Sequence, residues 1–277
     1  LAQGLVLLSL AWSGLLSPLY VFIVSAAMSM VRPSDSVMRY ALIGETVPGA
    51  YLMAAMSIER TTPDSARVVG ALTGAGMIAA FGIGPAYVVI CAFYALSFAL
   101  SAAIGREPAP SAAAPRLQTL RPSSWHDLLA AFGYVRRTPL LLASMCLAFL
   151  VNFTAYPLTI GLLPYVAKDI YHTDQTGLGY LAASFAGGGL IGSLVLTHRG
   201  HAIRSGRWML AFGAAWHALL ALFAFAGSIG WAIAALMLAG CAQSFSLVPM
   251  SAVVLQYSEP RYRRRVTAGN TSALAGP

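Results

Sequence analysis

Long stretches without a charged side chain alternate with short charged segments along this 277-residue chain. A helix that crosses the hydrocarbon core of a bilayer needs about 20 mainly apolar residues, and every uncharged stretch is longer than that. The pattern therefore predicts transmembrane helices. The uncharged stretches are 1–31, 68–105, 138–167, 175–198 and 208–258.

Several of these stretches are too long for one crossing. As a single helix, residues 68–105 would measure about 57 Å, whereas the hydrocarbon core is about 30 Å thick. Glycine-containing segments predict turns near 12–14, at 82–85 and at 227–230. We expect the third helix to begin before the membrane, near Gly49. The predicted spans are 1–12, 15–38, 62–82, 85–104, 140–163, 176–197, 207–226 and 231–256, with another starting near 266.

The basic residues predict how these spans are oriented. Of the 17 Lys and Arg residues, all but Lys168 lie in or next to alternate gaps between the spans. Cytoplasmic loops of membrane proteins are enriched in Lys and Arg, so the basic gaps are expected inside and the uncharged turns outside. The predicted cytoplasmic loops are 32–61, 106–137, 198–207 and 258–265.

Composition argues for an integral membrane protein and against a soluble one. Charged residues make up 9% of the chain, against about 25% in soluble domains. The net charge of +8 could indicate a nucleic-acid-binding protein. However, membrane orientation already explains the basic residues, and the chain lacks the stripe of arginine and aromatic side chains that such proteins use. The expected partner is therefore the lipid bilayer and not nucleic acid.

The motifs of common enzymes and metal sites are missing from the sequence. There is no phosphate-binding lysine loop for ATP and no metalloprotease helix motif. The spacing of Cys91, Cys146 and Cys241 fits neither a zinc site nor a disulfide framework, so we interpret them as packing residues. We therefore predict no enzymatic activity, no metal and no cofactor.

The polar segment 106–137 separates two sets of spans. Its opening is rich in Pro, Ala and Ser, which is typical of a flexible linker, and a short amphipathic helix is expected from Ser124 to Tyr134. We therefore predict an all-α polytopic helical bundle with two pseudo-symmetric halves, at 1–105 and 138–277. A weak repeat around Glu45 and Glu259 also favours two parallel halves.

Four sequence segments are similar to one transporter family. SARVVGALTGAG at 65–76 resembles the start of that family's fifth helix, with Ala71 where proline is usual. Residues 162–193 are similar to its seventh-to-eighth helix segment, and 248–269 to the end of helix ten with the loop that follows. HRGHAIRSGRW at 198–208 stands where the family repeats an acidic-basic motif, although it has no Asp.

In their order and spacing, these segments resemble the major facilitator superfamily, most closely its bacterial siderophore and multidrug exporters. The resemblance implies that the chain spans helices three to ten and the start of eleven, out of twelve. Residues 1–105 would then be helices 3 to 6 and residues 138–277 helices 7 to 11. We therefore expect the chain to be an internal piece of a longer protein.

The same resemblance implies a function. We expect a monomeric carrier in the bacterial cytoplasmic membrane. It would export amphipathic small molecules (drugs or siderophore-like metabolites) by proton-coupled alternating access. Two alternatives stay open, namely an uncoupled or import-direction carrier of the same fold and a non-transporting membrane fragment.

A few polar side chains lie at mid-depth in the predicted spans. The resemblance implies that the helices carrying them line a central cavity, so they are candidates for substrate contacts, with helix–helix hydrogen bonding as the alternative. These candidates are Asn152, Tyr156, Gln243, Ser244 and Tyr20.

Two pairs of charges lie near predicted cytoplasmic ends. Asp35 and Arg39 are four residues apart, and Asp64 and Arg67 are three apart, so each pair shares a helix face. Counting from the external turn places them near the inner surface. They are either a solvated rim or an inner gate, and Arg67 is the leading gate candidate.

Two further features have a structural and a functional interpretation. Small residues let helices approach closely, so the motif of Gly70, Gly74 and Gly76 and the pair of Gly188 and Gly192 both predict close packing. For Gly70 and Gly74 the alternative to static packing is a sliding seam between the two halves. His217 is the one titratable side chain deep in a predicted span, so it is either a proton carrier or a neutral packed side chain.

Overall fold

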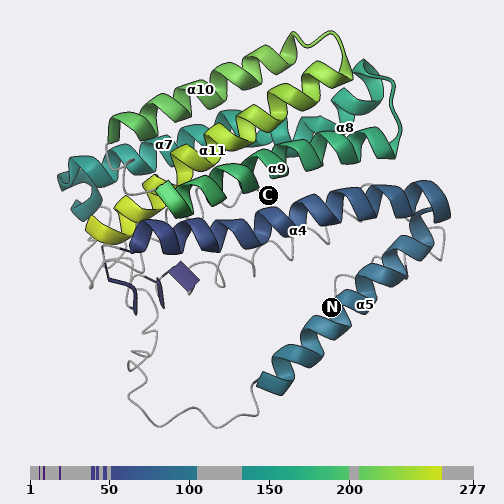
Figure 1. Cartoon of the computed structure of the whole chain (residues 1–277), viewed down its shortest axis with the longest axis horizontal. Coiled ribbons are helices and arrows are strands. Elements are labelled where there is room, and N and C mark those ends of the chain that lie inside the picture. The colour runs from purple at the N-terminus through teal and green to yellow at the C-terminus, as the bar shows by residue number, and fades with distance from the viewer. Residues whose placement is uncertain are drawn as a thin grey trace.

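The computed structural model describes residues 51–104, 133–199 and 206–257, together with 6, 9, 19, 39–40, 42–43 and 46–48. These residues form helices and connecting turns, and no strand is present among them (Figure 1). The all-α prediction is therefore confirmed. The predicted spans 1–12, 15–38 and the one near 266 lie outside the described residues, as does nearly all of the linker. The division into two halves stays a prediction.

The described helices follow the predicted spans closely, with longer ends. The third predicted span, 62–82, lies in a 30-residue helix that begins at Leu52, near the expected Gly49. The span predicted at 140–163 continues to Ile170 through π-helical turns. The elements are α4 (Leu52–Phe81), α5 (Ile83–Ile104), α7 (Pro139–Tyr156), η1 (Pro157–Leu162), α8 (Leu163–Tyr165), η2 (Val166–Ile170), α9 (Gln175–Arg199), α10 (Gly206–Ala224) and α11 (Ile229–Tyr257).

Proline and glycine explain two local departures from regular helix. Pro157 and Pro164 lack a backbone N–H, so the ordinary ladder is interrupted there, and π-helical turns occur on this stretch. Gly82 has φ of +79°, a conformation that glycine adopts without steric cost. It ends α4, and α5 then diverges from the other helices (Figure 1).

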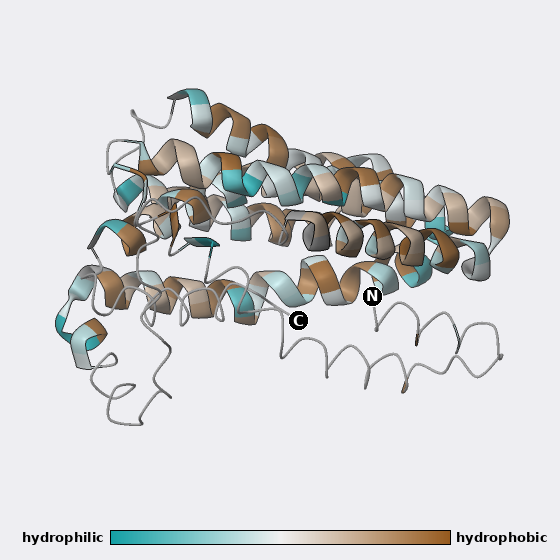
Figure 2. Ribbon diagram, turned by 90° about the horizontal axis from the view of Figure 1, so that it is seen from below, coloured by the Kyte–Doolittle hydropathy of each residue, from teal (hydrophilic) through white to brown (hydrophobic). Residues whose placement is uncertain are grey.

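Among the described residues, four helical segments are long and apolar enough to cross a membrane: Leu141–Ile170, Gln175–His198, Gly206–Ala224 and Ile229–Gln256. Apolar residues cover outward-facing as well as packed sides of the helices (Figure 2). Phe153, Phe225 and Trp231 are 72%, 84% and 74% exposed. Such large exposed apolar side chains suit contact with lipid rather than with water.

Helix α9 packs between α4 and α11, in the middle of the described bundle (Figure 1). Against α11 the backbones nearly touch. A Cβ at Gly188 would collide with the carbonyl oxygen of Met237, and one at Gly240 with that of Phe185. The close approach expected for Gly188 and Gly192 is confirmed, and it holds α9 and α11 together.

Helix α10 completes the described core on the other side of α11. The rings of Phe212 and Phe245 stack with centroids 4.7 Å apart, and the Ser246 hydroxyl donates to the carbonyl of Met209 at 3.1 Å. These pairs show that α10 and α11 run antiparallel, which places Trp216 at about the level of Gln243.

Candidate functional site

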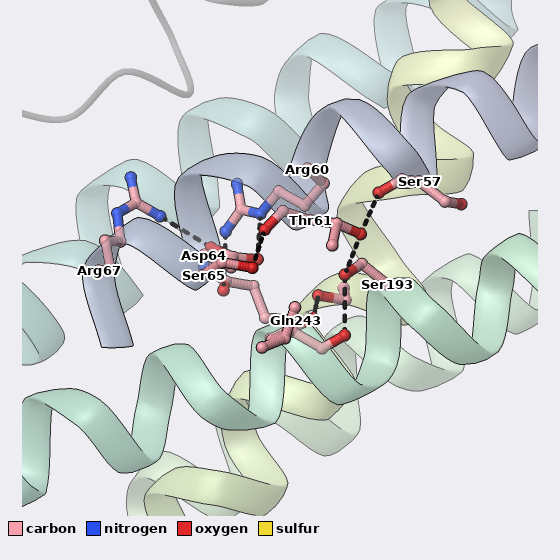
Figure 3. A network of polar contacts seen from close by, with 11 residues as sticks. Ser57, Arg60, Thr61, Asp64, Ser65, Arg67, Ser193 and Gln243 are labelled. Carbon is pink, nitrogen blue, oxygen red and sulfur yellow. Dashed lines mark hydrogen bonds and ion pairs between the residues drawn. The ribbon is translucent and has the colours of Figure 1, made fainter. Parts of the chain in front are cut away.

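A buried carboxylate on α4 is the centre of the described polar cluster (Figure 3). Asp64 is 1% exposed. Its Oδ2 accepts from Nε of Arg60 at 3.0 Å, and its Oδ1 accepts from a terminal guanidinium nitrogen of Arg67 at 3.1 Å. Because burying a lone carboxylate is costly, the two arginines are what makes this position tolerable. The sequence predicted the Asp64 and Arg67 pair but did not predict Arg60.

Arg60 also connects α4 to α11. A terminal guanidinium nitrogen of Arg60 donates to Oε1 of Gln243 at 3.1 Å (Figure 3). At the next residue of α4, the hydroxyls of Thr61 and Ser193 lie 3.0 Å apart, which connects α4 to α9. Since α4 belongs to the predicted N-terminal half and α9 and α11 to the C-terminal half, these two hydrogen bonds join segments from both predicted halves.

The cluster lies opposite the middle of its neighbours. An ideal Cβ on Gly189 would be 3.0 Å from Oδ2 of Asp64, and Gly189 lies well inside α9, between Gln175 and Arg199. Gln243 is equally far from both ends of α11. Asp64 therefore meets α9 near its middle, a contact that a count along one helix does not predict.

Hydroxyl groups make this polar part of α4 compatible with a helix in an apolar setting. Ser57, Thr61 and Ser65 each donate to the carbonyl four residues earlier, at 2.8–2.9 Å. Such bonds satisfy the hydroxyls within their own helix. Pro63 lies inside α4 as well and leaves the carbonyl of Glu59 without its helical donor.

Residues before the predicted span extend the polar cluster toward the predicted cytoplasmic side. Glu59 forms a hydrogen bond with the side chain of Tyr40 and interacts electrostatically with Arg39 and Arg60. Burial, assisted by the Glu59 charge, raises the pKa of Tyr40 to about 12. Tyr40 is therefore a neutral hydrogen-bonding group at physiological pH. Arg39 was predicted to pair with Asp35, but Asp35 lies outside the described residues.

The substrate-contact candidates on α7 face the same region. Tyr156 is buried, interacts electrostatically with Arg60, and meets Trp216 edge-on with ring centroids 6.2 Å apart. The amide nitrogen of Asn152 donates to the carbonyl of Ala148 in its own helix at 2.9 Å. Tyr156 thus interacts with Arg60 on α4 and with Trp216 on α10.

Of the two candidates on α11, Gln243 and Ser244 have different environments. The Ser244 hydroxyl donates to the carbonyl of Gly189 at 2.7 Å, which is the helix–helix hydrogen bond that we gave as the alternative to a substrate contact. Gln243 is 1% exposed, and its amide nitrogen has no acceptor among the described residues. The candidate Tyr20 lies outside the described residues.

His217 has hydrogen bonds that suit two protonation states. Its Nδ1 lies 2.8 Å from the carbonyl of Gly213, which can only accept, so Nδ1 carries a proton. Its Nε2 lies 2.8 Å from the hydroxyl of Thr154, which also lies 2.7 Å from the carbonyl of Leu150. The hydroxyl can donate to a neutral ring, or turn to Leu150 and accept from a charged one.

The glycine motif on α4 does not form the closest contact of that helix. Among the described residues, nothing lies within 4 Å of an ideal Cβ at Gly70, Gly74 or Gly76. The close approach to α9 instead uses Ala71 and Ala75, since a Cβ at Gly179 would be 3.0 Å from the carbonyl oxygen of Ala71 and 2.5 Å from Cβ of Ala75.

Arg60 is the residue that sequence reasoning missed. It was assigned to the predicted cytoplasmic loop 32–61, where an arginine has an ordinary explanation. Its spacing of four residues from Asp64 places both on one helix face, and that signal was available. Within the described part of the chain, no three His, Cys, Asp or Glu side chains come together as metal ligands.

Comparison with known protein families shows which family this chain matches. The family model described as Major Facilitator Superfamily matches residues 1–275. Neither the search of curated proteins nor the search of solved structures gave a match.

Proposed function

Because the chain belongs to the major facilitator superfamily, a family of membrane transporters, we propose that it exports amphipathic small molecules by proton-coupled alternating access. In such carriers two halves of the bundle rock about a site near the middle of the membrane. The observation that supports the proposal is the Arg60–Gln243 hydrogen bond, because it joins segments from the two predicted halves at the middle of α11.

The gate is a set of contacts that cross between helices, not the ion pairs themselves. Arg60, Asp64 and Arg67 all belong to α4 and move with it, so opening does not separate them. Opening does separate Arg60 from Gln243 and Thr61 from Ser193. A hydrogen bond to a charged group contributes about 1.5–3 kcal/mol and a neutral one about 1 kcal/mol, so both can break and reform in each cycle.

An amphipathic substrate suits the side chains around this cluster. Tyr156 and Trp216 offer aromatic surface, while Arg60 and Gln243 offer hydrogen bonds from two other helices. Binding sites for small molecules commonly combine a mainly apolar lining with a few placed polar groups. The proposed substrate is a drug-like or siderophore-like molecule with an apolar body.

His217 is the proposed proton carrier. A carrier must be stable both with and without the proton, and the Thr154 hydroxyl provides a partner for either state. His217 also keeps its bond to Gly213 in both states, so the ring does not need to turn.

The test is transport by the full-length protein in a host that lacks its own efflux pumps. Accumulation of lipophilic dyes and siderophores is measured with and without a proton uncoupler. Lower accumulation that the uncoupler abolishes supports proton-driven export, and His217→Gln should then abolish the uncoupler's effect. Lower accumulation without an uncoupler effect would favour an uncoupled exporter, and higher accumulation an importer. No change for any compound would contradict the export proposal.

A further inference from the structure

We propose that the transported molecule carries an anionic oxygen group, such as a carboxylate, and that Arg60 and Gln243 bind this group. The inference rests on the proposed transport function and adds the charge of the substrate. It comes from a count of hydrogen-bond donors and acceptors at the contact of α4 with α11 (Figure 3).

Arg60 has donors to spare in a buried position. A guanidinium group has five N–H donors and no acceptor. One goes to Asp64 and one to Gln243, while the side chain is only 18% exposed. Both oxygens of Asp64 are already engaged, by Arg60 and by Arg67. The carboxylate that holds Arg60 in place therefore leaves several of its donors available.

Gln243 adds a second unused donor next to Arg60. Since Arg60 can only donate, the amide oxygen of Gln243 must face it, and this fixes the orientation of the amide. The amide nitrogen then points elsewhere, and it is buried without an acceptor among the described residues. A buried unpaired donor destabilises the protein by about 1–3 kcal/mol. A ligand that places an acceptor there would remove this destabilisation.

Among the residues described, the surrounding layer contains one further donor without an acceptor. Trp216 lies at about the level of Gln243 on the neighbouring helix, is fully buried, and has an indole N–H without an acceptor in the described part of the chain. Tyr156, which contacts Trp216 and interacts electrostatically with Arg60, contributes an aromatic face. This layer suits a molecule with an apolar body and an oxygen-rich negative group.

Binding of such a group would also act on the gate. A carboxylate that accepts from Arg60 and from the amide nitrogen of Gln243 replaces the direct bond between these residues. The bond joins the predicted halves, so the substrate would weaken the contact that keeps them together. A static strut between helices has no need of unused donors and would not respond to an anion.

The experiment uses the full-length protein in lipid nanodiscs and three probes that share a ring system. The probes are 1-naphthaleneacetate, 1-naphthaleneacetamide and 1-naphthylethylamine, which differ in charge. Equilibrium dialysis gives each Kd. We expect the acid to bind about tenfold more tightly than the amide, because charge-assisted hydrogen bonds are the stronger kind.

Two variants of Gln243 separate binding from folding. Gln243→Leu should weaken acid binding about tenfold and leave amide binding within about twofold. Gln243→Glu keeps the side chain's size and its acceptor for Arg60, removes the donor and adds a negative charge, so it should reverse the preference from acid to amine. Gln256→Leu is the matched control, because Gln256 is exposed on the same helix.

The outcomes distinguish this inference from the proposed function. Equal affinity for acid, amide and amine, or a preference for the amine, would overturn the anionic group while leaving amphipathic transport in place. An acid preference that Gln243→Leu and Gln243→Glu do not alter would overturn the assignment to Gln243. Failure of all three probes to bind would overturn both the amphipathic-substrate proposal and the inference that rests on it.

Discussion

The two sides of α9 are packed in different ways. Toward α11, backbone meets backbone, with Gly188 against the carbonyl of Met237 and Gly240 against that of Phe185. Toward α4, side chains also take part: Thr61 meets Ser193, and Gly179 approaches Cβ of Ala75 as well as the carbonyl of Ala71. The first side joins helices of one predicted half, and the second joins helices of different halves.

This difference shows what distinguishes a fixed contact from one that can open. Backbone contacts leave no room for rearrangement, so the two helices move as one body. Side-chain hydrogen bonds can break individually, at about 1 kcal/mol for a neutral pair. The packing of α9 therefore suits a rigid partner in α11 and a separable partner in α4.

The largest effect is expected where backbones touch. Gly240→Leu would force α9 away from α11, because even a Cβ collides with the carbonyl of Phe185. We expect a loss of about 3 kcal/mol or more, seen as loss of monodisperse protein in size-exclusion chromatography after detergent extraction. Gly76→Leu is the control, since a Cβ there meets open space. Equal yields of the two variants would contradict the rigid contact.

The next largest effect is expected at the buried carboxylate. Asp64→Asn leaves the mostly buried Arg60 without an ion pair, and removing one partner of a buried pair costs about 3–5 kcal/mol. Chemical unfolding in mixed micelles would measure the loss. Asp169→Asn, at an exposed position near the end of a predicted span, should change stability little. A similar small change at Asp64 would show that Arg60 does not depend on it.

A smaller effect is expected at the contact that can open. Thr61→Val removes the hydroxyl that meets Ser193, at about 1 kcal/mol or a fivefold change in opening. Hydrogen–deuterium exchange should rise in peptides of α4 and in the α9 face toward it, but not in α11. Thr73→Val is the control, because Thr73 bonds to the carbonyl of its own helix. Faster exchange across the whole bundle would contradict a local contact.

The smallest effects on stability are expected for two glycine-to-alanine variants at the two faces of the contact between α4 and α9. Gly70→Ala is expected to raise stability by about 0.5–1 kcal/mol, since alanine favours a helix and its Cβ meets open space. Gly179→Ala should lower it, because its Cβ would press on Ala75. Thermal unfolding of both variants in one detergent decides the matter. If Gly70→Ala is the more destabilising, the motif does pack closely.

More of the fold than of the candidate site could be predicted from the sequence. Uncharged runs and turn glycines located α4, α5, α7, α9, α10 and α11 because a bilayer imposes a length and a polarity on each helix. The same reasoning misplaced Arg60, since a basic residue near a predicted cytoplasmic end already has an explanation in orientation.

Which face of a helix meets its neighbour was harder to predict. Gly188–Gly192 and Gly70–Gly74 share one spacing, yet only the first pair meets a backbone among the described residues. The contact of α4 falls on Ala71 and Ala75, one position along, which is a rotation of about 100°. Gln243 was predicted from its depth, whereas its contact with Arg60 depends on how α4 and α11 cross.

The membrane voltage acts on charges that move, and the buried ion pair of α4 cancels its own. Arg60 and Asp64 belong to one helix and travel together, so their displacement adds no net charge to the motion. One elementary charge moved across the membrane is worth about 2.3 kcal/mol per 100 mV. The formal charges of Glu59, Arg60, Asp64 and Arg67 on α4 sum to zero, so voltage dependence of transport would count the charge on the substrate and on the protons exchanged for it.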